Sequence, residues 1–147
     1  MTAEDILPLA ETRWWHIPHD ADMGIGVVSP YLDRAFEQAA LAMTRIITEA
    51  PVASELSVDI QCQAPDVEGL LVDWLNELVF EMATRNALFG RFQVQITGLQ
   101  LTATAWGEPV DQARHHPAVE VKGATYTDLL VQQDDQGLWQ LRCILDV

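Results

Sequence analysis

Apolar and polar residues alternate at every second position in three segments of this chain, which is the period of a strand with one buried face. The clearest segment is Glu55–Gln63, where Leu, Val, Ile and Cys alternate with polar residues. The same period occurs over Phe92–Ile96 and Leu99–Ala105, and Gly98 lies between these two segments. The pattern therefore predicts one isolated strand followed later by a hairpin that turns at Gly98.

Two other segments have apolar residues three and four positions apart and are predicted to be helices. The first spans about Tyr31–Glu49, with Ser29 as its N-cap and Pro30 at the first helical position. The second begins near Pro65–Asp66 and runs to about Arg85. Its apolar positions are Leu70, Leu71, Trp74, Leu75, Leu78, Val79, Phe80 and Met82. Because this stripe is broad, the second helix is expected to be covered on more than one side, as it would be between two sheets.

The remaining elements are short. Strands are predicted over Arg13–Ile17 and Ile25–Val28, on either side of the turn-rich segment Pro18–Gly24. The C-terminal part is expected to contain a polar loop over Gly107–Pro117, strand material over Val119–Val121 and Thr125–Gln133, and a final strand over Leu138–Leu145. Two helices with about seven strands, mostly antiparallel, predict an α+β sandwich rather than a repeating βαβ fold.

The length of 147 residues is that of one ordinary domain, assigned to residues 13–147 after a short acidic N-terminal arm, residues 1–12. The N-terminus lacks the pattern of a signal peptide, and no stretch approaches the roughly 18 apolar residues of a membrane span. Neither Cys62 nor Cys143 belongs to a Cys-x-x-Cys pair. We therefore expect a cytoplasmic protein without a membrane partner.

The excess of acidic residues argues against one class of function, the direct binding of nucleic acid. Eight Lys and Arg residues against 22 Asp and Glu residues give a net charge of −14, and Lys122 is the only lysine. Direct binding of nucleic acid is disfavoured, because its affinity comes from clustered cations that neutralise phosphates. An anionic surface suits a divalent cation, a basic protein partner, or solubility alone.

Three places could carry chemistry. The segment His19–Gly24 brings a histidine, Asp20 and Asp22 into a turn, where oxygen ligands for hard cations are often found. Asp146 lies on the opposite face of the last strand from its core residues, next to the end of the chain. Lys122 stands alone in a short apolar stretch. On these residues alone, a solvated turn, a frayed terminus and a solvated lysine are the simpler interpretations.

Other candidates are weaker. Asp73, Glu77 and Glu81 form an acidic ridge on the second predicted helix, which is typical of a solvated face. The pair His115–His116 lacks further ligands at metal spacing and is interpreted as part of a loop. The chain has no Gly-rich phosphate loop and no Gly-x-Ser-x-Gly motif, so no nucleophile is identified.

Taken together, several motifs give the chain a family resemblance from Trp15 onward. They are His19-Asp20-Ala21-Asp22-Met23-Gly24, Leu70-Leu71-Val72-Asp73-Trp74-Leu75-Asn76-Glu77-Leu78, Gly107-Glu108-Pro109, Glu120-Val121-Lys122-Gly123-Ala124-Thr125-Tyr126 and Leu145-Asp146-Val147. In order and spacing they resemble the archease family. The resemblance implies a three-layer β/α/β sandwich with two central helices.

The resemblance also implies a function. Archeases are non-catalytic accessory proteins of the GTP-dependent RNA ligase of the RtcB type, which acts in tRNA splicing or RNA repair, and they promote its guanylylation and turnover. The residues matching Asp22 and Asp146 hold a divalent cation with a backbone oxygen near Val147. That cation is usually calcium, with magnesium or manganese as alternatives. The matching lysine, Lys122, belongs to the same functional surface, on which we also place His19 and Asp20.

The chain departs from the family pattern at Asp20, Gly123 and Thr127, where Thr, Ala and His are common. Asp20 adds charge beside the expected cation, and Gly123 loosens the chain next to Lys122. The competing hypothesis is a metal-dependent hydrolase or nuclease that uses Asp22, Asp146 and His19. It is disfavoured because so few carboxylates and cations are available for metal and phosphate. A plain calcium-binding adaptor is the third alternative.

Overall fold

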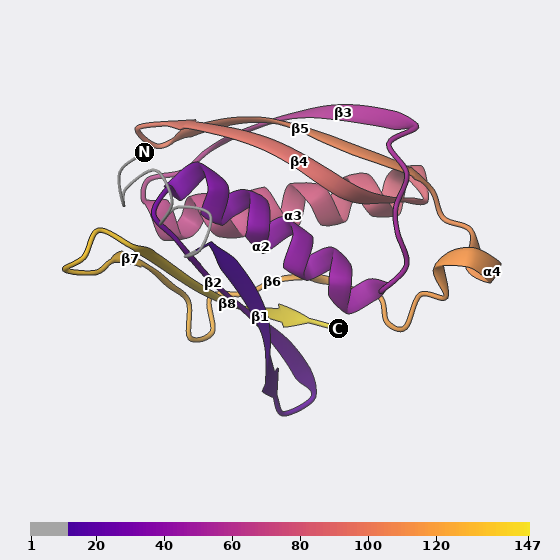
Figure 1. Ribbon diagram of the computed structural model, residues 1–147, viewed down its shortest axis with the longest axis horizontal. Helices are drawn as coiled ribbons and strands as arrows, with labels where there is room; N and C mark the ends of the chain where they lie inside the picture. The colour runs from indigo at the N-terminus through magenta and orange to yellow at the C-terminus, as the bar shows by residue number, and fades with distance from the viewer. Residues whose placement is uncertain (1–11) are drawn as a thin grey trace, which may run out of the picture.

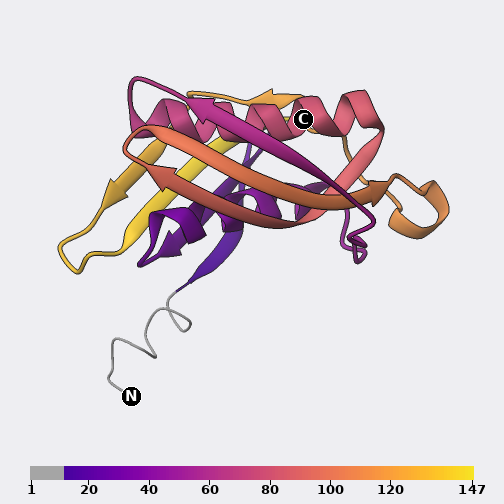
Figure 2. The same ribbon diagram turned by 90° about the horizontal axis from the view of Figure 1, so that it is seen from above.

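Two sheets enclose a layer of two long helices, as the apolar stripe of the second helix predicts (Figure 1). The computed structural model describes residues 12–147. One sheet has five strands and is called sheet A; the other has three and is called sheet B. Viewed from above, the strands of sheet B run across the helical layer (Figure 2). The α+β, three-layer β/α/β prediction is confirmed.

Sheet A collects strands from both ends of the described chain. Its path is β1 (Arg13–His19), β2 (Asp22–Ser29), β8 (Trp139–Asp146) and β6 (Gly123–Ala124), and β7 (Leu130–Gln133) also pairs with β8. All these pairs are antiparallel. Consequently β2 and β8, which are far apart in sequence, lie side by side.

Sheet B is built from the segments with the clearest alternation. It has the order β3 (Leu56–Gln63), β5 (Gln100–Pro109), β4 (Ala87–Thr97), and both pairs are antiparallel. Val58 and Ile60 are buried while the polar residues between them are exposed, as the alternation predicts. The hairpin at Gly98 is confirmed, and this glycine has a φ of 62°, a conformation that favours glycine.

The helices are α2 (Leu32–Ile47), α3 (Val67–Arg85) and the single turn α4 (Gln112–His115). The prediction of Ser29 as N-cap and Pro30 as the first helical residue was wrong: Ser29 ends β2, α2 begins at Leu32, and Tyr31 caps it without a side-chain hydrogen bond. The Ser29 hydroxyl instead accepts the Tyr31 N–H at 3.2 Å. In α3 the side chain of Asp66 accepts the Gly69 N–H at 2.7 Å, so this helix begins where the sequence predicts.

The core lies between the sheets, around α2 and α3. Trp74, Leu75, Leu78 and Phe36 are at most 1% exposed. The Trp74 indole N–H donates to the Phe36 carbonyl at 3.0 Å, which joins the two helices and satisfies a buried donor. Phe80, by contrast, is 58% exposed, so it was wrongly counted in the buried stripe of α3.

The segment after β5 differs from the prediction. Residues 107–109 end β5 rather than begin a loop, and α4 follows within the predicted loop. Val119–Val121 is not a strand, and of the predicted strand Thr125–Gln133 only Leu130–Gln133 is extended, as β7. Val121 is nevertheless buried, which explains the apolar signal.

Apart from Thr12, the predicted arm, residues 1–12, lies outside the described residues. The assignment of residues 13–147 to one domain stays a prediction. Within residues 12–147 no helix is both long and apolar enough to cross a membrane.

Candidate functional site

The predicted turn at Pro18–Gly24 is mostly strand. β1 runs to His19 and β2 begins at Asp22, so only Asp20 and Ala21 form the turn. Asp20 has a φ of 50°, a left-handed conformation that Asp tolerates better than most residues. The strand register pairs His19 with Asp22. Both side chains therefore project from the same face of sheet A.

The register between β2 and β8 brings the two predicted cation ligands together. Met23 pairs with Leu145, so the next antiparallel position places Asp22 opposite Asp146. Leu145 is fully buried against the helices, and Asp146 is exposed on the alternate, outer face. Asp22 and Asp146, here called the carboxylate row, thus lie on adjacent strands of sheet A, with His19 beside Asp22 on the next strand.

The carboxylate row has no compensating cation from the protein. Among residues 12–147, neither Asp22 nor Asp146 forms an ion pair within 4 Å. Like charges directly opposite each other on neighbouring strands destabilise a sheet. The carboxylate oxygens of the row are therefore free to bind a cation. A bound cation would also relieve the repulsion between the two negative charges.

The side chain of His19 contacts Asp128 rather than the carboxylate row. Its Nε2 lies 3.5 Å from Oδ2 of Asp128, and its Nδ1 is buried without a hydrogen-bond partner. Asp128 has a φ of 50°, and its carbonyl accepts Nε–H of Arg142 at 2.9 Å. Sequence reasoning missed Asp128, whose contact with His19 depends on the packing of a loop over sheet A and has no local signal.

Lys122 approaches the row through its backbone. Its N–H donates to the carbonyl of Asp146 at 2.7 Å. The side chain is exposed and forms no ion pair within the described part of the chain. The structure therefore places Lys122 beside Asp146 without joining its ammonium group to a carboxylate.

Val147 is held in place rather than frayed. Its side chain is partly buried and packs against the hydrophobic core. This packing does not agree with a frayed terminus, while the side chain of Asp146 itself is exposed, as in the solvated alternative. We call the carboxylate row, together with His19, Asp20, Lys122 and Val147, the tip.

The tip does not contain a ready-made cluster of metal-binding side chains. Over residues 12–147, no group of three or more His, Cys, Asp or Glu residues is arranged to hold a metal ion. Two carboxylates alone do not satisfy calcium, which takes about six to eight oxygens, often including backbone carbonyls and water. A cation held here would need main-chain oxygens and water in addition to Asp22 and Asp146.

A second carboxylate centre, missed by sequence reasoning, lies under α4. Glu108 is 2% exposed; its carboxylate accepts hydrogen bonds from Arg114 through both oxygens and from the Ala53 N–H. Nε2 of His115, a fully buried side chain rather than a loop residue, lies 3.2 Å from the same carboxylate. The Arg114 hydrogen bond is the main reason that the pKa of Glu108 falls from its usual value to about 2, followed by the Ala53 N–H. We call this the Glu108 cluster.

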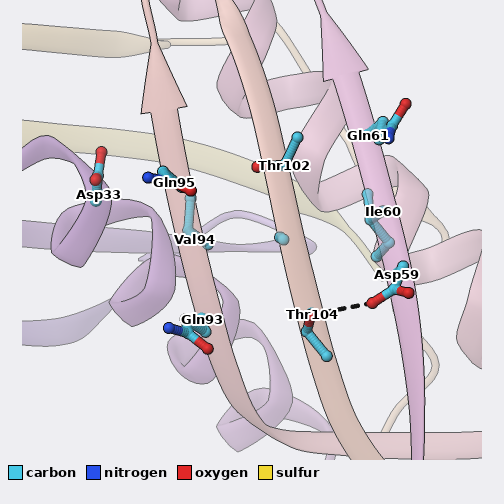
Figure 3. Close-up of a pocket in the computed structure, with 10 residues that line it drawn as sticks. Asp33, Asp59, Ile60, Gln61, Gln93, Val94, Gln95, Thr102 and Thr104 are labelled. Atoms are coloured by element: carbon cyan, nitrogen blue, oxygen red, sulfur yellow. Dashed lines mark hydrogen bonds between the residues drawn. The ribbon is translucent and has the colours of Figure 1, made fainter.

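A depression of about 550 Å³ lies elsewhere, on the outer face of sheet B (Figure 3). It is lined mainly by amide and hydroxyl side chains, and Thr104 donates to Asp59 across it at 3.0 Å. Its other carboxylate, Asp33, accepts the Ile96 N–H at 3.2 Å. Both carboxylates are already hydrogen-bonded, so the free acceptors of the tip define the better candidate site.

The fold agrees with comparisons to known proteins. The model of the Archease protein family (MTH1598/TM1083) matches residues 14–147. The chain is 32% identical over 140 residues to protein archease of Pyrococcus furiosus, covering 92% of this chain and 99% of that protein. It is 38% identical over 134 residues to protein archease of Methanothermobacter thermautotrophicus, covering 86% and 93%. The chain therefore belongs to the archease family.

Solved structures show the same fold. The solution structure of Methanobacterium thermoautotrophicum protein 1598 is 35% identical, with a TM-score of 0.74, covering 91% of this chain and 98% of that one. A crystal structure from Thermotoga maritima, described as an archease and possible chaperone, is 16% identical with a TM-score of 0.56, covering 89% and 94%. At that identity the second likeness supports the fold alone.

Proposed function

We propose that this chain is a non-catalytic, cation-binding activator of a GTP-dependent RNA ligase of the RtcB type, acting in tRNA splicing or RNA repair. The observation that carries the proposal is the carboxylate row: the register that pairs Met23 with Leu145 brings Asp22 and Asp146 to neighbouring positions of adjacent strands, and neither forms an ion pair within residues 12–147. Membership of the archease family supports the choice of partner. The description of the Thermotoga maritima relative as a possible chaperone is compatible with an accessory protein that acts on another protein.

The donor set fits a hard divalent cation, with calcium as the first choice and magnesium or manganese as alternatives. Asp22 and Asp146 would supply carboxylate oxygens. The Asp146 carbonyl already accepts the Lys122 N–H, so a further main-chain oxygen would come from Val147, whose position is fixed by the core. Water would fill the remaining positions, at about 2.3–2.6 Å for calcium. The bound cation would neutralise the repulsion within the row.

The rest of the molecule favours docking rather than catalysis. The net charge of −14 gives the body an anionic surface, and Lys122 presents an unpaired cation beside the row. A small polar tip on an anionic body suits transient docking into the cationic, nucleotide-binding mouth of a ligase. There the tip would deliver a cation or steady the ligase conformation that accepts GMP.

The hydrolase or nuclease hypothesis gains no support from the geometry. It requires His19 to act with Asp22 and Asp146, but Nε2 of His19 faces Asp128 instead. It also requires several protein ligands around the metal, whereas residues 12–147 hold no group of three or more His, Cys, Asp or Glu residues arranged to bind one. Phosphodiesterase activity of the purified protein would restore this alternative.

The test combines one binding and one activity measurement. Calorimetry with calcium should show one site that is lost in Asp22→Asn, and a time course of ligase–GMP formation should be faster with the wild-type protein than without it. Equal calcium affinity in the two proteins would contradict the cation site. An unchanged ligase time course would contradict the activator function.

A further inference from the structure

A side chain of the central helix reaches the segment that carries Lys122. Asn76 is a half-buried polar residue of α3 that lies next to the buried Leu75. Its Oδ1 accepts the N–H of Ala124, in β6, at 2.8 Å. Within residues 12–147 it is the only side chain of α3 that forms a hydrogen bond to a strand of sheet A. Asn76 therefore connects the rigid core to the edge of the tip.

This contact occurs next to an irregular hydrogen bond, which lies just before β6 at Lys122. Lys122 donates to the Asp146 carbonyl at 2.7 Å and Thr125 donates to the Ile144 carbonyl at 3.0 Å. The donors are three residues apart, while their acceptors are two residues apart. The segment between them therefore contains one residue more than the ladder needs, as in a β-bulge. Within β6 the register is regular, with Gly123 opposite Asp146 and Ala124 opposite Leu145. Because the hydrogen-bonded position is Thr125, the N–H of Ala124 points away from β8, and Asn76 satisfies it.

Gly123 completes the arrangement. A Cβ added at this position would lie 3.1 Å from Oδ1 of Asn76, closer than such atoms usually approach. The glycine thus leaves room for the amide oxygen to reach the next residue. A larger residue at position 123 would press on the same oxygen from the other side.

From this geometry we propose that Asn76 is the positioning residue of the tip. By holding the Ala124 N–H, it sets how Lys122 lies against Asp146, and so fixes one end of the carboxylate row and the orientation from which Lys122 extends. This role requires an acceptor oxygen in the side chain at position 76. An apolar side chain of the same size would pack there but would not bind the Ala124 N–H. The consequence for ligase activation rests on the function proposed above, but the consequence for the geometry of the tip does not.

The test compares two near-isosteric substitutions at one position. Asn76→Leu removes the acceptor, and Asn76→Asp keeps it. We expect Asn76→Leu to speed amide exchange at Ala124 by about twofold to tenfold, the range that corresponds to one lost hydrogen bond. The NMR resonances of Lys122 and Asp146 should shift and calcium affinity should fall, while Asn76→Asp should restore all three.

Thr44→Val is the matched control. Thr44 donates from α2 to the Phe89 carbonyl at 2.7 Å, so this variant also loses one side-chain bond to the backbone, a buried one, but on the side of the helical layer that faces sheet B. It should be destabilised by a similar amount and leave the tip resonances and calcium affinity unchanged. Gly123→Ala should shift the same resonances as Asn76→Leu. The shift caused by Gly123→Ala should be smaller when it is introduced into the Asn76→Ala variant, which already lacks the amide oxygen.

The outcomes separate this inference from the proposed function. If Asn76→Leu folds with wild-type exchange and resonances at Ala124, Lys122 and Asp146, the positioning role is wrong whatever the ligase does. Equal perturbation of the tip by Asn76→Leu and Thr44→Val would also overturn it, because general destabilisation would then be sufficient. If the wild-type protein fails to accelerate ligase guanylylation, the proposed function fails, while the exchange and resonance data still decide the role of Asn76.

Discussion

Two parts of the molecule hold carboxylates, and their surroundings are opposite. In the Glu108 cluster, the carboxylate is buried and accepts hydrogen bonds from Arg114 and from a backbone N–H, with His115 close by. In the carboxylate row, Asp22 and Asp146 face each other on adjacent strands and form no ion pair within the described structure. The oxygens of Glu108 therefore already accept hydrogen bonds from the protein. The carboxylate oxygens of Asp22 and Asp146 remain available to a ligand.

This difference distinguishes a structural carboxylate from one that is available to a ligand. Glu108 joins the end of β5 to α4 and to the chain before β3, so its partners lie within the fold. Burial of a carboxylate is tolerated only with such compensation. The row is at the surface, where its repulsion is tolerated but not relieved by the protein. A partner from outside is therefore expected at the row and not at Glu108.

The largest effect on stability is expected in the core between these two regions. Leu78→Ala should lower the free energy of unfolding by about 2–5 kcal/mol, because Leu78 is buried and its truncation leaves a cavity. Urea denaturation would measure this. A loss below about 1 kcal/mol would mean that α3 is not enclosed on both sides.

Glu108→Gln should also destabilise the protein, and with a defined pH dependence. Because folding lowers the pKa of Glu108 from 4.5 to about 2, its ionised form stabilises the fold above pH 4.5, and this contribution is lost as the pH falls toward 2. Unfolding free energy should therefore fall more steeply between pH 4.5 and 2 in the wild type than in Glu108→Gln. Parallel curves would show that Glu108 is not the linked group.

Asp22→Asn should leave the fold intact but weaken calcium binding by about tenfold or more, equivalent to about 1.4 kcal/mol. Asp59→Asn is the matched control, since Asp59 lies on a strand of sheet B and bonds Thr104. Calorimetry should show wild-type affinity in the control. An equal loss of calcium affinity in both variants would mean that calcium binding depends on the total charge of the protein rather than on the carboxylate row.

Lys122→Ala should change the unfolding free energy by less than about 0.5 kcal/mol, because the side chain is exposed. The Lys122→Ala protein should nevertheless fail to accelerate ligase guanylylation. The acceleration by the wild type should itself weaken with salt, since exposed charges are screened over about 10 Å at 0.1 M. Salt-independent acceleration would argue against docking led by charge.

The smallest effect is expected from Glu81→Lys. Glu81 pairs with Arg85 on the same helix at 2.5 Å, and an i,i+4 pair contributes about 0.3–0.5 kcal/mol. This variant changes the net charge of the protein by two without touching the tip, so ligase guanylylation should remain near the wild-type rate. A loss as large as that of Lys122→Ala would show that overall charge controls activation.

Much of the fold was predictable because it follows from local periodicity. The alternation of Leu56–Gln63 and the spacing of Leu70–Leu78 specify a strand and a helix whatever the remaining chain does. Phe80 was misassigned because a broad apolar stripe does not show which of its edges faces solvent. The Pro18–Gly24 turn was too long because Asp20 adopts a left-handed conformation that tightens the hairpin to two residues.

The site was only partly predictable. Asp22, Asp146 and Lys122 were identified from motifs, and the structure brings them to one end of sheet A. Their partners were missed because the contacts join residues distant in sequence. Asp128 reaches His19 across 109 positions, and Asn76 reaches Ala124 across 48. Such contacts follow from how the layers pack, which no local pattern encodes.

The most direct test of the account is the rate at which a GTP-dependent RNA ligase of the RtcB type forms its GMP adduct, with and without this protein. The wild type should accelerate the reaction in the presence of calcium, magnesium or manganese, Asp22→Asn and Lys122→Ala should not, and Glu81→Lys should behave as the wild type. Full acceleration by both tip variants would contradict the central claim that the carboxylate row and Lys122 form the activating surface.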